Sequence, residues 1–398
     1  MANFYCCLFG VGGLIDLFFK NNGLNYIDDQ CHISGNLLHV FLRKYLVMKK
    51  TYPNAITSYT GVNSDISLQY WKIIQWLFWL IGIILLLIMF FKPSVGTMLF
   101  WNILIPVAPA LLVVATGVWR NICPLATTAL LPDRLGVSKK KKLSVYQRNW
   151  FNLIGVTILF LIIPLRHVLF NNNGQATAFI IILLGIMALI MGFVYERKSA
   201  WCSGLCPIHG VEKLYGSGVA FTVPNAQCNE CVKCSVPCPD STSNVNPLTL
   251  KRSMKSKAIE YLMVGAFPGY IWGWFQVPDF QPNKGWKYLD IVYGYPIMGA
   301  IATLILYLFI IEITEHKKRK QIVNIFAAAA VSCYYWFRLP LLFGFKKVNF
   351  ISTLVDLSNS LPNWSMTVLN LLTTAFFVWW IVIRKKTKRS WSIRPEYA

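Results

Sequence analysis

The sequence predicts an all-α polytopic membrane protein, and its composition and the length of its apolar runs carry that prediction. Of the 398 residues, 56% are hydrophobic and only 14% are charged, against about 25% charged in soluble domains. Several stretches approach the ~20 apolar residues that span the hydrocarbon layer. The formal charge of +22 comes from basic residues between these runs, which favours membrane topology over nucleic-acid binding.

About eight transmembrane helices are expected from the apolar runs. They cover residues 73–91, 97–118, 150–169, 176–195, 258–278, 288–312, 322–344 and 366–383. An even number of spans places both termini on one side of the membrane.

The basic residues fall mainly on that side. Of the 38 Lys and Arg, 31 lie in residues 1–72, 120–148, 196–257, 314–320 and 384–398. Cytoplasmic loops carry such an excess, so both termini should be cytoplasmic in a multi-pass protein of the inner (plasma) membrane.

Five regions follow from this topology. They are an N-terminal cytoplasmic region (1–72), two transmembrane hairpins with Cys-Pro loops (73–200), a cytoplasmic cysteine-rich segment (201–257), four further transmembrane helices (258–383) and a basic tail (384–398).

Cysteine patterns are the strongest signal of function. Residues 228–239 read Cys-Asn-Glu-Cys-Val-Lys-Cys-Ser-Val-Pro-Cys-Pro, the C-x2-C-x2-C-x3-C-P spacing of a bacterial ferredoxin. Cytoplasmic thiols stay reduced, so metal binding is favoured over disulfides. Zinc is the alternative, although zinc sites usually draw their ligands as two separated pairs. The segment 201–257 is therefore predicted to carry a ferredoxin-like iron-sulfur loop.

Two Cys-Pro pairs supply further ligands. Cys202 and Cys206 follow the fourth span with the C-x3-C-P spacing, and Cys123-Pro124 occupies the same place after the second span, which indicates an internal repeat. The predicted ligands are Cys206, Cys228, Cys231 and Cys234 for one [4Fe-4S] cluster, and Cys238, Cys202 and Cys123 for a second. Trp119 stands where the other copy has Cys202, so the fourth ligand of the second cluster is unknown. Cys6, Cys7 and Cys31 are candidates for it, although each is more simply a buried inert cysteine.

Histidines do not support a haem between the spans. Such a haem needs a pair of histidines at membrane depth, but only His167 lies in a predicted span. We expect Arg166 and His167 to form an anchoring pair at the membrane interface.

Two membrane Cys-Pro loops followed by a ferredoxin run resemble the NapH/NosR-type membrane-bound 4Fe-4S ferredoxins, which include members of nitrate and nitrous oxide reductase systems. The similarity covers about residues 73–245. It implies an iron-sulfur protein that passes electrons between a quinone or cytoplasmic donor and a respiratory or maturation partner. This chain departs from many relatives in having one ferredoxin run and no cysteine at Trp119.

We therefore expect an electron-transfer subunit with one or two [4Fe-4S] clusters, rather than a stand-alone enzyme. Its expected partners are membrane lipid and either a redox protein or a quinone, with no nucleic acid. The alternative is a membrane scaffold or transporter with a structural zinc or a sensory iron-sulfur site. The metal that the protein contains separates the two hypotheses.

Overall fold

The computed structural model describes residues 65–195, 200–216, 218–220, 222–226, 254–278, 280, 284–315, 318–346, 353–384 and 391–393. The chain divides into two compact units, residues 1–54 and 55–398, and every described residue belongs to the second unit. Most of the predicted N-terminal region therefore lies outside the described residues.

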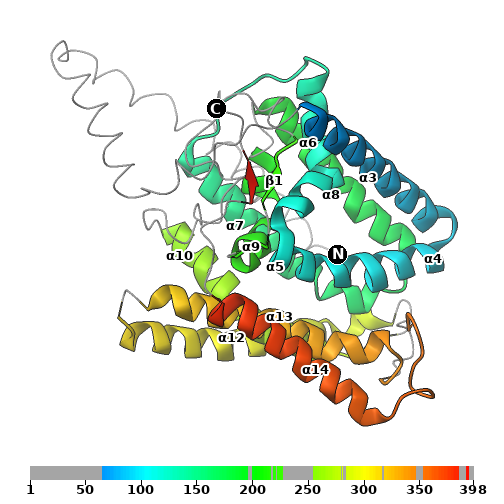
Figure 1. Cartoon of the computed structure of the whole chain (residues 1–398), viewed down its shortest axis with the longest axis vertical. Helices are drawn as coiled ribbons and strands as arrows, with labels where there is room; N and C mark the ends of the chain where they lie inside the picture. The colour runs from blue at the N-terminus through cyan, green and yellow to red at the C-terminus, as the bar shows by residue number, and fades with distance from the viewer. Residues whose placement is uncertain are drawn as a thin grey trace, which may run out of the picture. The chain divides into compact units, whose positions relative to one another are not determined.

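Helices dominate the described residues (Figure 1). The first half contains α3 (Asp65–Phe91), α4 (Pro93–Met98), η1 (Leu99–Leu104), α5 (Ile105–Ile122), α6 (Pro124–Arg134), α7 (Val145–Ile162), η2 (Arg166–Phe170), α8 (Gly174–Val194), η3 (Trp201–Leu205) and α9 (His209–Tyr215). The second half contains α10 (Met254–Glu260), η4 (Tyr261–Ala266), α11 (Phe267–Gln276), η5 (Gly285–Tyr288), α12 (Leu289–Ile313), α13 (Arg319–Leu342), α14 (Asn363–Val378) and η6 (Trp379–Ile383). Two short strands, β1 (Val223–Pro224) and β2 (Ser392–Ile393), pair in parallel.

Six helical segments among the described residues are long and apolar enough to cross a membrane. They are Gln69–Phe91, Pro93–Arg134, Gly174–Val194, Gly285–Ile313, Arg319–Leu342 and Asn363–Ile383. The prediction of an all-α polytopic membrane protein is confirmed at this level. The predicted spans 150–169 and 258–278 are also helical, in α7 with η2 and in α10, η4 and α11, but they fall outside this set of six.

Glycines bring α11 and α12 into backbone contact. Gly265, Gly269 and Gly273 recur every fourth residue and so share one helix face. A Cβ on Gly269 would meet the Gly299 carbonyl oxygen of α12. The Gly269 amide also donates a hydrogen bond to the Thr303 hydroxyl at 3.2 Å. Such close approach gives van der Waals packing between helices that lipid alone does not drive together.

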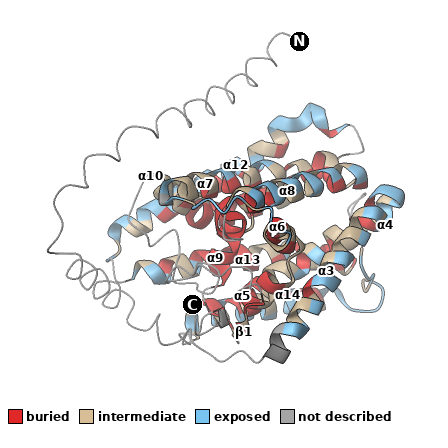
Figure 2. Ribbon diagram, turned by 90° about the horizontal axis from the view of Figure 1, so that it is seen from above, coloured by how far each residue is buried: buried red, intermediate tan, exposed pale blue. Residues whose placement is uncertain are grey.

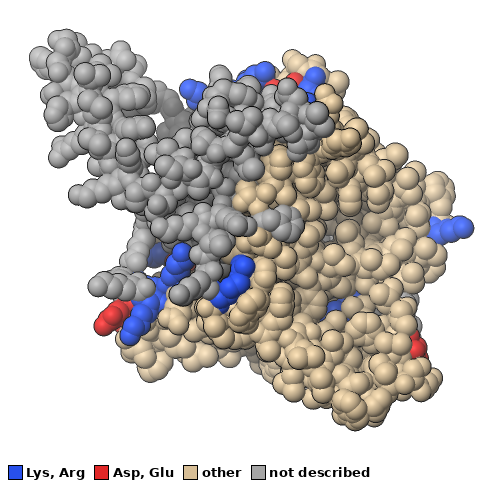
Figure 3. Space-filling model, viewed as in Figure 1, with Lys and Arg blue, Asp and Glu red and all other residues tan. Residues whose placement is uncertain are grey.

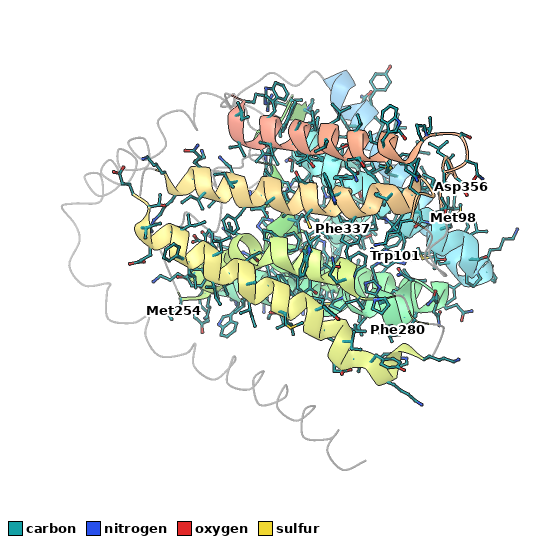
Figure 4. All side chains as sticks on the ribbon, turned by 90° about the horizontal axis from the view of Figure 1, so that it is seen from below. Met98, Trp101, Met254, Phe280, Phe337 and Asp356 are labelled. Atoms are coloured by element: carbon teal, nitrogen blue, oxygen red, sulfur yellow. The ribbon has the colours of Figure 1, made fainter. Side chains whose placement is uncertain are left out.

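A polar cluster lies at one end of the helices, where Figure 4 labels Trp101; Met254 is labelled at the opposite end. The Arg166 guanidinium lies between the rings of Trp101 and Trp274, 4.0 and 4.8 Å from their centroids. His167 Nε2 lies 3.1 Å from the Trp274 carbonyl oxygen. Both Arg166 and His167 are buried, so the expected interface-anchoring pair is wrong. The two residues hold helices to one another instead.

The helix surfaces divide into a buried interior and an apolar exterior. In Figure 2 α9 is buried along its length, whereas α3 and α8 show exposed faces. Large hydrophobic side chains are exposed along α3, α8, α12 and α14. Figure 3 shows a broad surface without charge, with most of the visible charged side chains at its margins. This distribution is typical of helices that face lipid.

Candidate functional site: two Cys-Pro turns and a buried ion pair

The two Cys-Pro pairs adopt the same local structure. Cys123 lies between α5 and α6 with φ −62° and ψ 118°, and Cys206 lies between η3 and α9 with φ −59° and ψ 122°. In each copy the cysteine carbonyl accepts a hydrogen bond of 3.1 Å from the amide three residues later, Ala126 or His209. A following proline disfavours helical φ and ψ at the preceding residue. The sequence repeat is therefore also a repeat of backbone conformation.

Tertiary packing brings the two turns to one place. Cys202 is a buried member of an apolar cluster, and Cys123 and Cys206 pack against that cluster, which includes Trp201 and Leu205. Three predicted ligands, 79 and 4 residues apart in the chain, thus pack in one apolar cluster, Cys202 buried and the other two partly exposed. The two Cys-Pro turns therefore pack against the same apolar cluster.

The surroundings of Cys206 disfavour an isolated thiolate. Burial raises the pKa of the Cys206 thiol, and Glu212 and Cys123 raise it further, whereas the Arg120 guanidinium opposes them. A cysteine in such a place behaves as an inert thiol unless a metal stabilises its anionic form.

Glycines let neighbouring helices approach both turns. A Cβ on Gly155 of α7 would lie 2.7 Å from the Leu205 carbonyl oxygen and 3.2 Å from that of Cys206. A Cβ on Gly82 of α3 would lie 3.3 Å from the Pro124 ring. The first turn therefore packs closely against α3, and the second packs closely against α7.

A buried ion pair joins the two copies. Arg120, three residues before Cys123, donates to a Glu212 carboxylate oxygen at 2.5 Å, and both side chains are almost fully buried. His209 Nδ1 lies 3.3 Å from the Arg120 guanidinium nitrogen and 3.8 Å from the same carboxylate oxygen. The pair therefore links α5, which precedes the first turn, to α9, which follows the second (Figure 1).

The ionisation states of this group follow from burial and charge. Burial lowers the pKa of His209 to about 4, so this imidazole is neutral at pH 7. Burial opposes ionisation of Glu212, but the Arg120 guanidinium and His209 outweigh it and hold the pKa of the carboxyl below its usual range. Arg120 and Glu212 therefore both stay charged.

The C-terminal segment closes one side of the ion pair. Trp391 is completely buried, with Arg120 Cζ 4.9 Å and Lys213 Nζ 4.1 Å from its ring centroid. Its indole Nε1 donates to the Gly216 carbonyl at 2.7 Å. A Cβ on Gly117 would meet the Trp391 carbonyl oxygen. Part of the predicted basic tail thus packs against the site.

The same region holds Pro224, which precedes the ferredoxin run. Asn121, two residues before Cys123, donates to the Pro224 carbonyl at 2.6 Å. Pro224 also belongs to β1, which pairs with β2. Cys228 follows four residues later, and four extended residues cover at most about 14 Å. The covalent chain alone keeps the first cysteine of the run within that distance of Pro224.

The remaining predicted ligands lie outside the described residues. These are Cys228, Cys231, Cys234 and Cys238, together with the candidates Cys6, Cys7 and Cys31. Over the part of the chain that the structure describes, no group of three Cys, His, Asp or Glu side chains is arranged to hold a metal ion by itself. The gathered donors are thiols, which suit iron-sulfur clusters and zinc alike. Cys123, Cys202 and Cys206 fit such a centre as partial ligands that further cysteines must complete.

Sequence reasoning missed four residues of this site. Arg120, Glu212, Lys213 and Trp391 come from three separate segments, and only their proximity reveals them. A weak signal existed in Glu212, a rare acidic residue three positions after His209. No comparable signal marked Trp391 within its basic tail.

Comparison with known proteins adds no family: no family model, no curated protein and no solved structure matches the chain.

Proposed function

We propose that the chain is a membrane electron-transfer protein that holds one or two [4Fe-4S] clusters at its cytoplasmic face. The observation that carries this proposal is the packing of two Cys-Pro turns of the same backbone conformation against one apolar cluster. Electrons would pass between a quinone or cytoplasmic donor and a respiratory or maturation partner, as the resemblance to NapH/NosR-type ferredoxins implies.

The ligand assignment keeps the reciprocal pattern of the two cysteine runs. Cys206, Cys228, Cys231 and Cys234 would hold one cluster, and Cys238, Cys202 and Cys123 would belong to a second. Bound clusters supply one-electron transfer. The packing of Cys123 and Cys206 against the same apolar residues supports two closely spaced centres, or a single centre that takes both cysteines.

The protein residues around the turns prepare the site. Trp201 and Leu205 bury Cys202 and cover part of Cys123 and Cys206, and the lower polarity there strengthens electrostatic interactions. Gly155 and the proline of each turn fix the carbonyl groups beside the sulfur atoms. The buried Arg120–Glu212 pair holds α5, which precedes the first turn, against α9, which follows the second.

The proposed orientation places this site in the cytoplasm. Eight spans, with both termini inside the plasma membrane, account for the 31 basic residues on one side. The six apolar helices agree with a multi-pass protein. The buried cluster of Arg166 and His167, beside Trp101 and at the end opposite Met254, would then lie toward the outer side of the membrane.

Anaerobic purification of the full chain tests the proposal. We expect a brown protein with iron and acid-labile sulfide in near equal amounts, and visible absorption that bleaches with dithionite. Cys206→Ser should lower iron content, whereas Cys333→Ser, in the middle of α13 and outside the site, should not. A colourless protein with stoichiometric zinc would refute electron transfer and support the scaffold or transporter hypothesis.

The same variants test the ligand assignment. If Cys206→Ser leaves the reduced-state EPR signal intact while Cys238→Ser abolishes that cluster, the crossing pattern is wrong. If Cys123→Ser and Cys206→Ser each remove the same signal, the two cysteines belong to one centre.

A further inference from the structure

We propose that Arg120, Lys213 and Glu212 act as positioning residues that set the reduction potential of the cluster held by Cys206. The inference rests on the proposed function, because it concerns the same site. It adds a role for charged side chains that no cysteine pattern discloses.

Three buried charged side chains lie beside the turns. Arg120, Lys213 and Glu212 are each at most 5% exposed. Arg120 and Glu212 form a direct ion pair, and Lys213 follows Glu212 on the same short helix, α9. Two cations and one carboxylate thus lie together in a buried region.

Arg120 and Glu212 lie close to the predicted ligand. The His209 amide donates to the Cys206 carbonyl at 3.1 Å, and His209 Nδ1 lies 3.3 Å from the Arg120 guanidinium nitrogen and 3.8 Å from the Glu212 carboxylate oxygen. Glu212 raises the pKa of the Cys206 thiol, and Arg120 lowers it. The same electrostatic interaction applies to any negative charge gathered near that sulfur atom. Bound thiolates carry such charge, and reduction adds one electron to it.

The sign of the charge decides the direction in which the reduction potential shifts. A buried cation stabilises the more negative, reduced state and raises the reduction potential, whereas a buried carboxylate lowers it. Net charge around a cluster is one of the factors that spread iron-sulfur potentials over a wide range. Low polarity makes each buried charge act more strongly than a surface charge.

The indole of Trp391 keeps the two cations in place. Trp391 lies against both Arg120 and Lys213, and the indole is fixed by its hydrogen bond to Gly216. Cation–π contact with a buried indole offsets part of the cost of keeping these charges out of water. The C-terminal segment thereby holds the positive charges next to the turns.

The experiment is an EPR-monitored redox titration of the full chain in detergent. We expect Glu212→Gln to raise the midpoint potential and Lys213→Gln to lower it, each by at least a tenfold change in the oxidised-to-reduced ratio, or about 59 mV. Lys213→Arg keeps the charge and should keep the potential. The controls Glu312→Gln and Lys320→Gln remove the same charges at exposed positions of α12 and α13 and should shift the potential little.

Opposite shifts from Glu212→Gln and Lys213→Gln support the proposal, because a purely structural defect does not follow the sign of the charge removed. Shifts of one sign, or none, overturn it. Should Glu212→Gln fail to fold, the comparison of Lys213→Gln with Lys213→Arg decides alone. Unaltered protein without iron would instead overturn the proposed function, and the inference with it.

Discussion

Replacing Gly155 by alanine tests whether α7 positions the second Cys-Pro turn. The new Cβ would lie 2.7 Å from the Leu205 carbonyl oxygen and 3.2 Å from that of Cys206, whereas ordinary contacts begin at 3.4 Å. Backbone on both sides must therefore shift by several tenths of an ångström. Because the new Cβ would clash with carbonyl oxygens of the turn, Cys206 itself should move.

The energy of this change is the balance of two effects. Overpacking costs about 1–3 kcal/mol, and alanine in place of glycine gains at most about 1 kcal/mol of helix propensity. We expect a net destabilisation of about 1–2 kcal/mol. The displaced turn should also retain less iron than unaltered protein.

Thermal unfolding in detergent and iron per chain are the measurements. Gly294→Ala is the matched control, since nothing lies within 4 Å of a Cβ built there in α12. It should leave iron content unchanged and stability equal or slightly higher. Gly155→Ala protein as stable and as rich in iron as this control would refute the argument that close packing of α7 sets the turn.

Three further outcomes are expected. Reporter tags at Asn172 and Asn283 should label from outside the cell, because the basic loops lie inside; an inward report from either removes that hairpin from the topology. Gly269→Leu should force α11 away from the α12 backbone and lower the unfolding temperature, whereas Gly294→Leu, which has open space, should not. Burial lowers the pKa of His209 to about 4, so the unfolded chain binds more protons between about pH 4 and 6.5 and stability falls as the pH drops through that range. His209→Gln should flatten this dependence, and an unchanged pH profile would contradict the burial argument.

Composition and local spacing are enough to predict a helical membrane protein and the backbone conformation of its Cys-Pro turns. Apolar runs and few charges predict membrane helices, because hydrocarbon admits only segments whose backbone groups pair internally. Proline after Cys123 and Cys206 restricts the cysteine backbone whatever the surroundings, so the amino-acid order is enough to predict the local repeat. Such features depend on neighbours in the chain.

Residues at helix ends were harder to place from sequence. Arg166 and His167 have the composition of an interface anchor, yet both are buried, and Arg166 lies between the rings of Trp101 and Trp274. Hydropathy shows that a residue is polar but not which neighbouring helix covers it. The number of spans has the same difficulty, since α7 and α10 carry polar residues at their first turns.

Only the tertiary structure decided which side chains surround the cysteines. Arg120 and Glu212 are 92 residues apart, and Trp391 lies 175 residues beyond Gly216. No periodicity encodes such pairings, because they depend on how α5, α9 and the C-terminal strand pack in three dimensions. The sequence by itself determined a membrane chain with cysteine turns. The packing of distant segments determined which charged side chains lie beside those turns. Burial then makes the electrostatic interactions between these side chains strong.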